Sequence, residues 1–370
     1  MTFSSTHGAH VNGQPGRKDG NVRVLVVDDS AFARSTISRR INAETGLEVV
    51  GEARDGMEAV DQVKALRPDV VTMDVTMPRL DGLGAVKRIM AEQPTPIVML
   101  SALTGPGADV TLQALELGAI DFFLKPSIAT PAGSADGISE LAVKLRVAAG
   151  ARISTGRLIT ARKSVKKAQP GGDFDTLVII GSSTGGPNAL SRVIPSLPAD
   201  LNAAVLVVQH MPPHFTASLS VRLNTASELE VNEASEGDRI QRGRVLLAPG
   251  GFHMTINANG TVSLNTDLEV HGVRPSVDVT MRSAVEQFKG VCHGVILTGM
   301  GSDGKNGCQL IKAAGGSVLT EHESTCAVYG MPKSVVDAGY ADRVAPIDEI
   351  AREIGRMCGA RRSTGIAARR

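Results

Sequence analysis

Hydrophobic residues recur along the chain as short, uninterrupted runs, separated by segments of helical periodicity and by polar turns. Runs of this length predict strands that are buried on both faces, as in a parallel sheet. In the first half of the chain, such strands are expected at 22–27, 47–51, 70–73, 97–100 and 120–124. Each run is followed by a helical segment. This alternation predicts an α/β fold with a five-stranded, doubly wound parallel sheet.

The second half shows the same pattern with wider spacing. Buried strands are expected at 177–180, 203–208, 245–247 and 294–297. Between two alternating segments, Asn259-Gly260 predicts a β-hairpin within 252–264. Helices are expected after Asp278 and from about Gly307. The second half therefore predicts another α/β parallel-sheet domain, carrying a hairpin.

A length of 370 residues fits two domains. We expect a disordered leader over 1–20, a first domain over 21–149, a linker over 150–172, a second domain over 173–357 and a basic tail over 358–370. The linker is basic and rich in Ser, Thr and Gly, which is typical of a solvated tether. A tether for an acidic partner is the alternative.

Composition narrows the function classes. The net charge of +1, the 3% of aromatic residues and the absence of Trp argue against nucleic-acid binding. The four cysteines form no C-x-x-C pair, which favours a reduced, cytoplasmic chain without a zinc site. No apolar run has the length of a membrane span, and the leader lacks the apolar core of a signal peptide. We expect no direct membrane insertion.

Polar residues end several strands of the first sheet: Asp28, Asp29, Asp74, Ser101 and Lys125. The carboxyl ends of parallel strands lie along one edge, so these residues should converge. Three carboxylates there need a positive charge, which a hard cation such as Mg²⁺ and the lysine would supply. Taken singly, each residue reads as a helix cap or turn. Together they favour a site that places a phosphoryl group on a carboxylate.

In the second domain, the segment 181–187 (GSSTGGP) follows a buried strand and opens a helix. The glycines permit a tight turn, and Pro187 suits a first helical turn. An anion cradle, a serine nucleophile and a purely structural turn are all compatible with this segment. No Gly-Lys-Ser/Thr follows the glycines, so a P-loop is excluded and the nucleophile gains weight.

Three strand ends of the second domain offer Ser182 or Ser183, His210 and Asp303. A serine needs a base, histidine suits that role near neutral pH, and a carboxylate fixes its tautomer. His214 is more typical of a helix start, and Asp303 taken alone reads as an N-cap. No G-x-S-x-G elbow is present, so this would be a separate solution to the triad geometry.

The first domain resembles the receiver domain of two-component response regulators, with its flavodoxin-like fold. The resemblance rests on the Asp28-Asp29 pair, on 73–78 (MDVTMP), and on Ser101-Ala102 and Lys125-Pro126. It implies that Asp74 accepts a phosphoryl group from a histidine kinase. It also implies that Asp28, Asp29, Asp74 and the Thr76 carbonyl bind Mg²⁺, that Ser101 and Lys125 contact the phosphoryl oxygens, and that Phe122 is the aromatic switch residue.

The second domain resembles the catalytic domain of chemotaxis protein-glutamate methylesterases. The shared motifs are 181–187, 209–213 (QHMPP), 247–250 (LAPG), 274–278 (RPSVD) and 297–304 (LTGMGSDG). The resemblance implies Ser183 as nucleophile, His210 as base, Asp303 as orienting carboxylate and the Met300 N–H as oxyanion donor, without a cofactor for the esterase. Position alone leaves Ser182 open as the nucleophile. Thr184 is expected to help hold the site.

The two resemblances imply a phosphorylation-activated hydrolase that demethylates glutamate γ-methyl esters on chemoreceptors and deamidates receptor glutamines. We expect the unphosphorylated first domain to lie over the Ser183–His210 cleft and to limit access. The alternative is a phospho-switched docking protein without catalysis. A DNA-binding regulator is disfavoured, because the second domain is too large for a helix-turn-helix and lacks a basic, aromatic-bearing patch.

Overall fold

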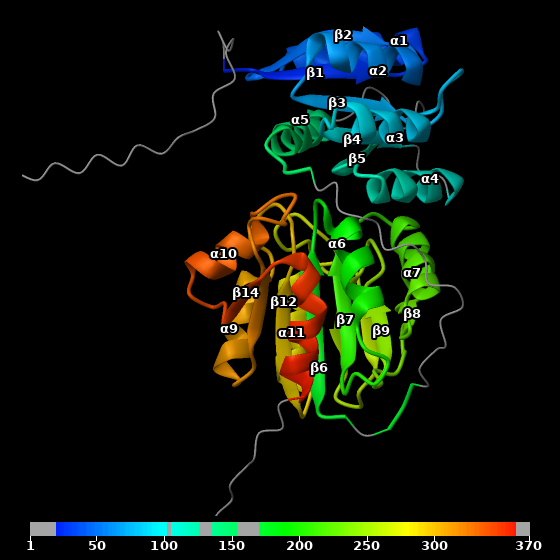
Figure 1. Ribbon diagram of the computed structural model, residues 1–370. Helices are drawn as coiled ribbons and strands as arrows, with labels where there is room; N and C mark the ends of the chain where they lie inside the picture. Colours follow the sequence, from blue (N-terminus) through cyan, green and yellow to red (C-terminus); the bar gives the residue numbers. More distant parts are fainter. Residues whose placement is uncertain (1–19, 102–104, 126–134, 154–169, 173, 360–370) are drawn as a thin grey trace, which may run out of the picture.

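A computed structural model describes residues 20–101, 105–125, 135–153, 170–172 and 174–359. It contains two parallel sheets in two separate lobes (Figure 1). The leader, most of the linker and the basic tail lie outside the described residues. Within the described part of the chain, no helix is both long and apolar enough to cross a membrane.

The first sheet has the strand order β2-β1-β3-β4-β5, all parallel. As predicted, five strands alternate with helices. The elements are β1 (Val22–Val27), α1 (Ala31–Asn42), β2 (Leu47–Ala53), α2 (Gly56–Leu66), β3 (Val70–Asp74), α3 (Gly82–Glu92), β4 (Ile97–Ser101), α4 (Gly105–Glu116), β5 (Asp121–Leu124) and α5 (Ala135–Ala149).

The second sheet has seven parallel strands in the order β14-β13-β12-β6-β7-β9-β8. Its strands are β6 (Thr176–Ser182), β7 (Ala204–Gln209), β8 (Glu230–Glu233), β9 (Arg244–Leu247), β12 (Val291–Ile296), β13 (Val318–Glu321) and β14 (Arg343–Ala345). The predicted hairpin is present as β10 (His253–Ile256) and β11 (Val262–Asn265), with antiparallel pairing. The helices are α6 (Gly186–Val193), the 3₁₀ turn η1 (Ile194–Ser196), α7 (Phe215–Ala226), α8 (Val277–Gln287), α9 (Lys305–Ala313), α10 (Met331–Asp337) and α11 (Ile347–Gly359).

Three strands of this sheet, β8, β13 and β14, were not among the expected ones. β8 and β14 are the two edges of the sheet, and β14 is only three residues long. An edge strand need not be apolar on both faces, so β8 reads Glu-Val-Asn-Glu and shows no continuous hydrophobic run. The central strands β6 and β7 are buried along their whole length, which is why the sequence pattern found them.

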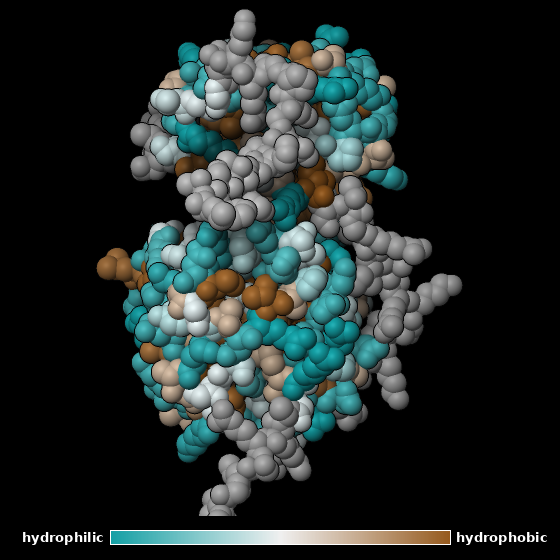
Figure 2. Space-filling view, turned by 60° about the vertical axis from the view of Figure 1, so that its left-hand side comes forward, coloured by the Kyte–Doolittle hydropathy of each residue, from teal (hydrophilic) through white to brown (hydrophobic). Residues whose placement is uncertain are grey.

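The hydrophobic core continues from one lobe to the other. One cluster of buried residues includes Leu115 and Phe122 of the first lobe together with Leu190, Phe215 and Leu219 of the second. Helix α4 packs against α6 and α7 at this junction (Figure 1). On the face shown in Figure 2, the outer surface is mainly hydrophilic, with hydrophobic residues in small separate groups. Some large hydrophobic side chains are nevertheless exposed, such as Phe32 at 82% and Leu268 at 90%.

Candidate functional site

The two neighbouring serines at the end of β6 have different surroundings. Ser182 is fully buried, and its hydroxyl donates to Oε1 of Gln209 at 2.7 Å. Ser183 follows the strand and is only partly buried. Ser182 is therefore a structural donor, and Ser183 is the serine whose side chain is accessible.

Glycines shape the turn that carries Ser183. Gly185 has φ +78° and is the N-cap of α6, and a Cβ there would lie 2.6 Å from Cβ of Ala327. A Cβ at Gly186 would lie 1.9 Å from Oε1 of Gln209. Only glycine fits both positions, because the backbone conformation at the first and the close packing at both exclude a side chain. As predicted, Pro187 lies in the first turn of α6.

His210 lies beside Ser183 at the same edge of the sheet. The strand pairing sets Ser182 opposite Gln209, and His210 N–H donates to the Ser182 carbonyl at 3.1 Å. Gln209 Nε2 donates to the carbonyls of both Ser183 and His210, at 3.0 Å each. Neighbouring strands are about 4.7–4.9 Å apart, so the two side chains emerge next to each other. In the described coordinates, no hydrogen bond joins the two side chains.

His210 is paired with Asp303. Its Nε2 lies 2.8 Å from Oδ2 of Asp303, a carboxylate that is 2% exposed. This bond leaves Nδ1 as the ring nitrogen that can accept a proton. Burial acts to raise the pKa of Asp303, but the hydrogen bond and charge of His210, with the N–H groups of Val277 and Asp278, outweigh it and hold the pKa below its ordinary value.

Asp303 is not the N-cap of the helix that follows it, since Gly304 holds that place in α9. Its carboxylate instead caps α8, accepting from the N–H groups of Val277 at 2.7 Å and Asp278 at 3.0 Å. The helix start predicted at His214 is confirmed, because His214 is the N-cap residue of α7, with φ +70°.

The loop 298–300 packs directly against Ser183. Ser183 N–H donates to the Thr298 carbonyl at 3.0 Å, and a Cβ on Gly299 would lie 2.8 Å from Cβ of Ser183. Met300 follows and is 41% exposed. Among the described residues, its N–H donates to no protein acceptor. An N–H without a protein acceptor, in a loop that packs against Ser183, is the kind of donor that an oxyanion requires.

Two buried residues that the sequence interpretation missed hold this loop and strand end in place. Gln209 bonds both serines, as described above. Glu321, 1% exposed at the end of β13, accepts the Thr298 N–H at 2.9 Å, and burial raises its pKa. Their positions in the sequence could have indicated this role. Each is the last residue of a strand, and the candidate site residues also lie at strand ends.

Thr184 contacts both the site and the other domain. Its carbonyl accepts from Thr298 Oγ1 at 3.0 Å, which helps to hold the loop 298–300 as expected. Thr184 Oγ1 donates to Oδ2 of Asp121 at 2.8 Å, and Asp121 begins β5 of the first sheet. The next residue, Phe122, is buried and stacks on Phe215 of α7, with ring centroids 4.4 Å apart and an interplanar angle of 10°. The predicted switch residue therefore lies in the interface between the domains, one residue from a direct contact with the nucleophile turn.

The predicted acidic cluster also converges. Ligand oxygens of Asp28, Asp29 and Asp74 all lie within 4.8 Å of one another. Lys125 Nζ lies 2.6 Å from Asp28 and 2.8 Å from Asp74. Burial and the neighbouring Asp28 raise the pKa of Asp74 despite the hydrogen bond from Lys125. Burial acts to lower the pKa of Lys125, but its hydrogen bonds to both carboxylates raise it.

Excess negative charge therefore remains at this edge, because Lys125 carries one positive charge and the cluster contains three carboxylates. The donor set of clustered carboxylate oxygens fits a hard divalent cation. Of the other predicted residues, Ser101 is fully buried at the end of β4 and Thr111 Oγ1 donates to its hydroxyl at 2.8 Å. Thr76 is exposed in the loop after β3, two residues beyond Asp74.

Comparison with known proteins finds one family match in each lobe. Residues 178–354 match the CheB methylesterase family, and residues 24–130 match the response regulator receiver domain. A solved structure, the Thermotoga maritima CheB methylesterase catalytic domain, is 47% identical and covers 49% of this chain and 97% of its own, with a TM-score of 0.48.

Two curated relatives are each named protein-glutamate methylesterase/protein-glutamine glutaminase. The protein of Symbiobacterium thermophilum is 46% identical over 91% of this chain and 97% of its own length. That of Archaeoglobus fulgidus is 48% identical over 91% of this chain and 98% of its own length. Since identity of this level extends along nearly the whole of both proteins, the chain belongs to the protein-glutamate methylesterase/protein-glutamine glutaminase family, with a receiver domain preceding its CheB methylesterase domain.

Proposed function

We propose that this protein hydrolyses glutamate γ-methyl esters on methyl-accepting chemoreceptors, releasing methanol, and deamidates receptor glutamines. The observation that carries the proposal is the buried His210–Asp303 pair beside the accessible Ser183, in a chain of this family. The acidic cluster of the receiver domain supports control by phosphorylation of Asp74 by a histidine kinase.

In the first half of the reaction, Ser183 Oγ attacks the ester carbonyl carbon while His210 Nδ1 takes the hydroxyl proton. The tetrahedral intermediate carries its negative charge on the former carbonyl oxygen, which the Met300 N–H stabilises. The intermediate then expels the methoxy group, which leaves as methanol with the proton from His210. Asp303 holds the imidazole in one tautomer and stabilises its protonated form.

In the second half, water attacks the acyl-serine ester while His210 takes its proton. Ser183 leaves with that proton, and the receptor side chain is released as glutamate. A glutamine side chain follows the same route with ammonia as leaving group, which depends more strongly on protonation by His210 because an amide is a poorer substrate.

In the receiver domain, an Asp74 oxygen attacks the phosphorus atom of a phosphohistidine donor, and the histidine leaves. Asp28, Asp29 and Asp74 with the Thr76 carbonyl would hold Mg²⁺, which neutralises charge on the transferred group. Lys125 and Ser101 bind phosphoryl oxygens. Because Lys125 bridges Asp28 and Asp74 without the phosphoryl group, phosphorylation must rearrange this contact.

The interface connects this site to the esterase. Asp121, Phe122 and Lys125 belong to one short segment, of which the first two contact Thr184 and Phe215. A shift of that segment on phosphorylation would weaken the docking of the receiver domain over the Ser183–His210 edge. The docked state limits substrate access, and phosphorylation shifts the population toward the open state.

Methanol release from receptor membranes carrying radiolabelled methyl esters, with and without a small phosphodonor, tests the proposal. Ser183→Ala should lower the rate by at least about 10³-fold, whereas the matched neighbour variant Ser182→Ala should retain most activity. Asp74→Asn should abolish the response to the phosphodonor. A non-catalytic docking protein would release no methanol in any of these forms.

A further inference from the structure

A second buried carboxylate lies next to the His210–Asp303 pair. Asp278, at the start of α8, is 2% exposed and accepts three hydrogen bonds. The donors are Gly307 N at 2.7 Å, Asn306 Nδ2 at 3.1 Å and His271 Nε2 at 2.9 Å. His271 belongs to the loop between β11 and α8, and its side chain is 35% exposed. The site thus contains two histidine–carboxylate pairs, of which the triad uses one.

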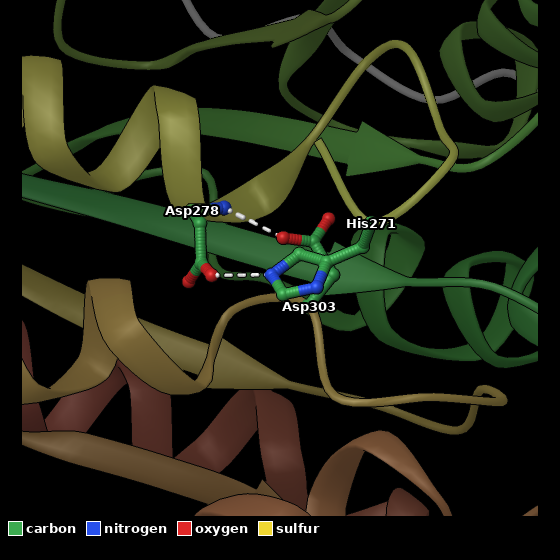
Figure 3. Close-up of side chains that lie close together, drawn as sticks. All are labelled: His271, Asp278 and Asp303. Carbon is green, nitrogen blue, oxygen red and sulfur yellow. Dashed lines mark hydrogen bonds and ion pairs between the residues drawn. The ribbon is translucent and has the colours of Figure 1, made fainter. Parts of the chain in front are cut away.

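The two carboxylates hold each other's segments. Asp303 Oδ1 accepts from Asp278 N–H and from Ser276 Oγ, so the segment that bears Asp278 fixes the triad carboxylate (Figure 3). In return, Asp278 Oδ1 accepts the N–H of Gly307, in the first turn of the helix that follows Asp303. Asp303 therefore caps α8, which contains Asp278, and Asp278 caps α9, which follows Asp303.

Ligand atoms of His271, Asp278 and Asp303 lie within 4.8 Å of one another, a spacing that a metal ion could use. All four carboxylate oxygens, however, already accept hydrogen bonds from N–H or O–H groups. A cation would have to displace donors whose hydrogens point at the same oxygens. The donor pattern therefore fits a closed hydrogen-bond network.

We propose that Asp278, held by His271, is a positioning residue that fixes Asp303 behind His210 in the ester hydrolysis proposed above. The inference rests on that proposed function, because its kinetic test measures ester hydrolysis. The His271–Asp278 bond also links the alignment of the triad to the loop 266–275, which is tied to β10 by His253 Nε2 at 3.1 Å from the Leu268 carbonyl.

Asp278→Asn breaks the network with little change in volume. An asparagine offers one oxygen, so its NH₂ group would face the donors Asn306 Nδ2 and His271 Nε2. The remaining oxygen can still accept the Gly307 N–H, but the NH₂ group repels the two side-chain donors. We expect this repulsion to shift the first turn of α9, and Asp303 with it. Small displacements of a catalytic group cost about 10²-fold or less, so we expect kcat to fall roughly 10-fold to 100-fold. KM should stay within about twofold, because Asp278 lies behind the triad carboxylate and not beside Ser183.

The experiment uses the full chain and compares Asp278→Asn with the double variant His271→Ala/Asn306→Ala. The double variant removes two donors from exposed positions, so it should fold even where Asp278→Asn does not. Asp342→Asn is the matched control, since Asp342 also accepts a backbone N–H, from Val318 at 2.8 Å, but at the opposite end of the sheet strands. Adding back His271→Gln in place of His271→Ala should restore part of kcat, because the amide can still donate.

A second readout needs no substrate. The ring N–H of His210 bonded to Asp303 should give a downfield proton resonance, which Asp278→Asn and the double variant should shift and Asp342→Asn should not. If the resonance shifts but wild-type protein releases no methanol, the proposed function fails and the positioning role stands. If the folded double variant keeps both the wild-type resonance and wild-type kcat, the positioning role is wrong.

Discussion

At the scale of single residues, burial separates side chains that the sequence presents as equivalent. Ser182 and Ser183 are adjacent and chemically identical, yet the Ser182 hydroxyl is bonded inside the sheet and Ser183 is only partly buried. Asp303 and Asp278 are both buried at helix starts, but only Asp303 contacts His210. The chemistry of each group follows from what it touches.

Asp303→Asn should leave the geometry almost unchanged but favour the wrong imidazole tautomer, because the amide nitrogen can donate to His210 Nε2. We expect kcat to fall by about 10³-fold to 10⁴-fold. Single-turnover methanol release measures the loss. A decrease of less than tenfold in a folded variant would show that the carboxylate has no orienting role.

Asp303 should also contribute to acid stability. Its pKa is held below the ordinary value of 3.8 in the folded protein. The stabilisation is therefore complete above that pH and is lost as the pH falls through the folded-state pKa. Urea unfolding between pH 5 and pH 2 should show a steeper loss of stability for wild type than for Asp303→Asn; parallel curves would contradict this expectation.

At the scale of elements, the turn from β6 into α6 is the most constrained segment of the site. Gly185 combines a left-handed backbone with close contact to Ala327, and Gly186 contacts Gln209. These contacts set the direction in which Ser183 leaves the strand. Gly355 of α11 has no such role, because a Cβ there would meet open space.

Gly185→Ala should lower the free energy of unfolding by about 2 kcal/mol and reduce kcat, since both the backbone and Ala327 must shift. Gly355→Ala is the control and should raise stability by about 0.5–1 kcal/mol, because alanine is the better helix former. Chemical denaturation and methanol release measure the two effects. Equal effects of both substitutions would rule out a special role for the turn.

At the scale of the whole molecule, the receiver domain is packed on the methylesterase domain next to the turn that carries Ser183. The contact combines the stacked Phe122 and Phe215, the Thr184–Asp121 bond and a two-point ion pair between Glu116 of α4 and Arg222 of α7. Arg152, after α5, adds contacts to Glu323 and to the Ala327 carbonyl. Docking therefore depends on both apolar and charged contacts. The charged contacts can be broken by one substitution and restored by exchanging the two charges.

Glu116→Lys sets two positive charges against each other across the interface. The pair is partly exposed, so a loss of about 1 kcal/mol in docking is expected, which corresponds to roughly a fivefold rise in basal esterase activity without phosphodonor. Glu116→Lys/Arg222→Glu restores opposite charges and should return the basal rate toward wild type. Equal basal rates in all three proteins would show that docking does not limit access.

The sequence by itself determined the five strands of the first sheet and four of the seven strands of the second, with the residues at their ends. Buried central strands tend to be continuous apolar runs, and the ends of parallel strands gather at one edge. Asp28, Asp29, Asp74 and Lys125 could be grouped from this rule alone. The same rule grouped His210 and Asp303 with the two serines, and the family resemblance then implied Ser183 as the nucleophile. The edge strands β8 and β14 could not be predicted, since exposure on an edge removes the pattern that marks a strand.

Only the tertiary structure decided which serine is accessible, because both hydroxyls occupy the same segment and differ in the neighbours that the fold supplies. It also decided that Thr184 contacts the first domain and Phe122 contacts the second, since no local pattern encodes a contact between separate lobes. The mutual capping by Asp278 and Asp303 was likewise decided only by the tertiary structure. Hydrogen bonds between segments 25 residues apart depend on how two helices pack, and that packing is a property of the whole fold.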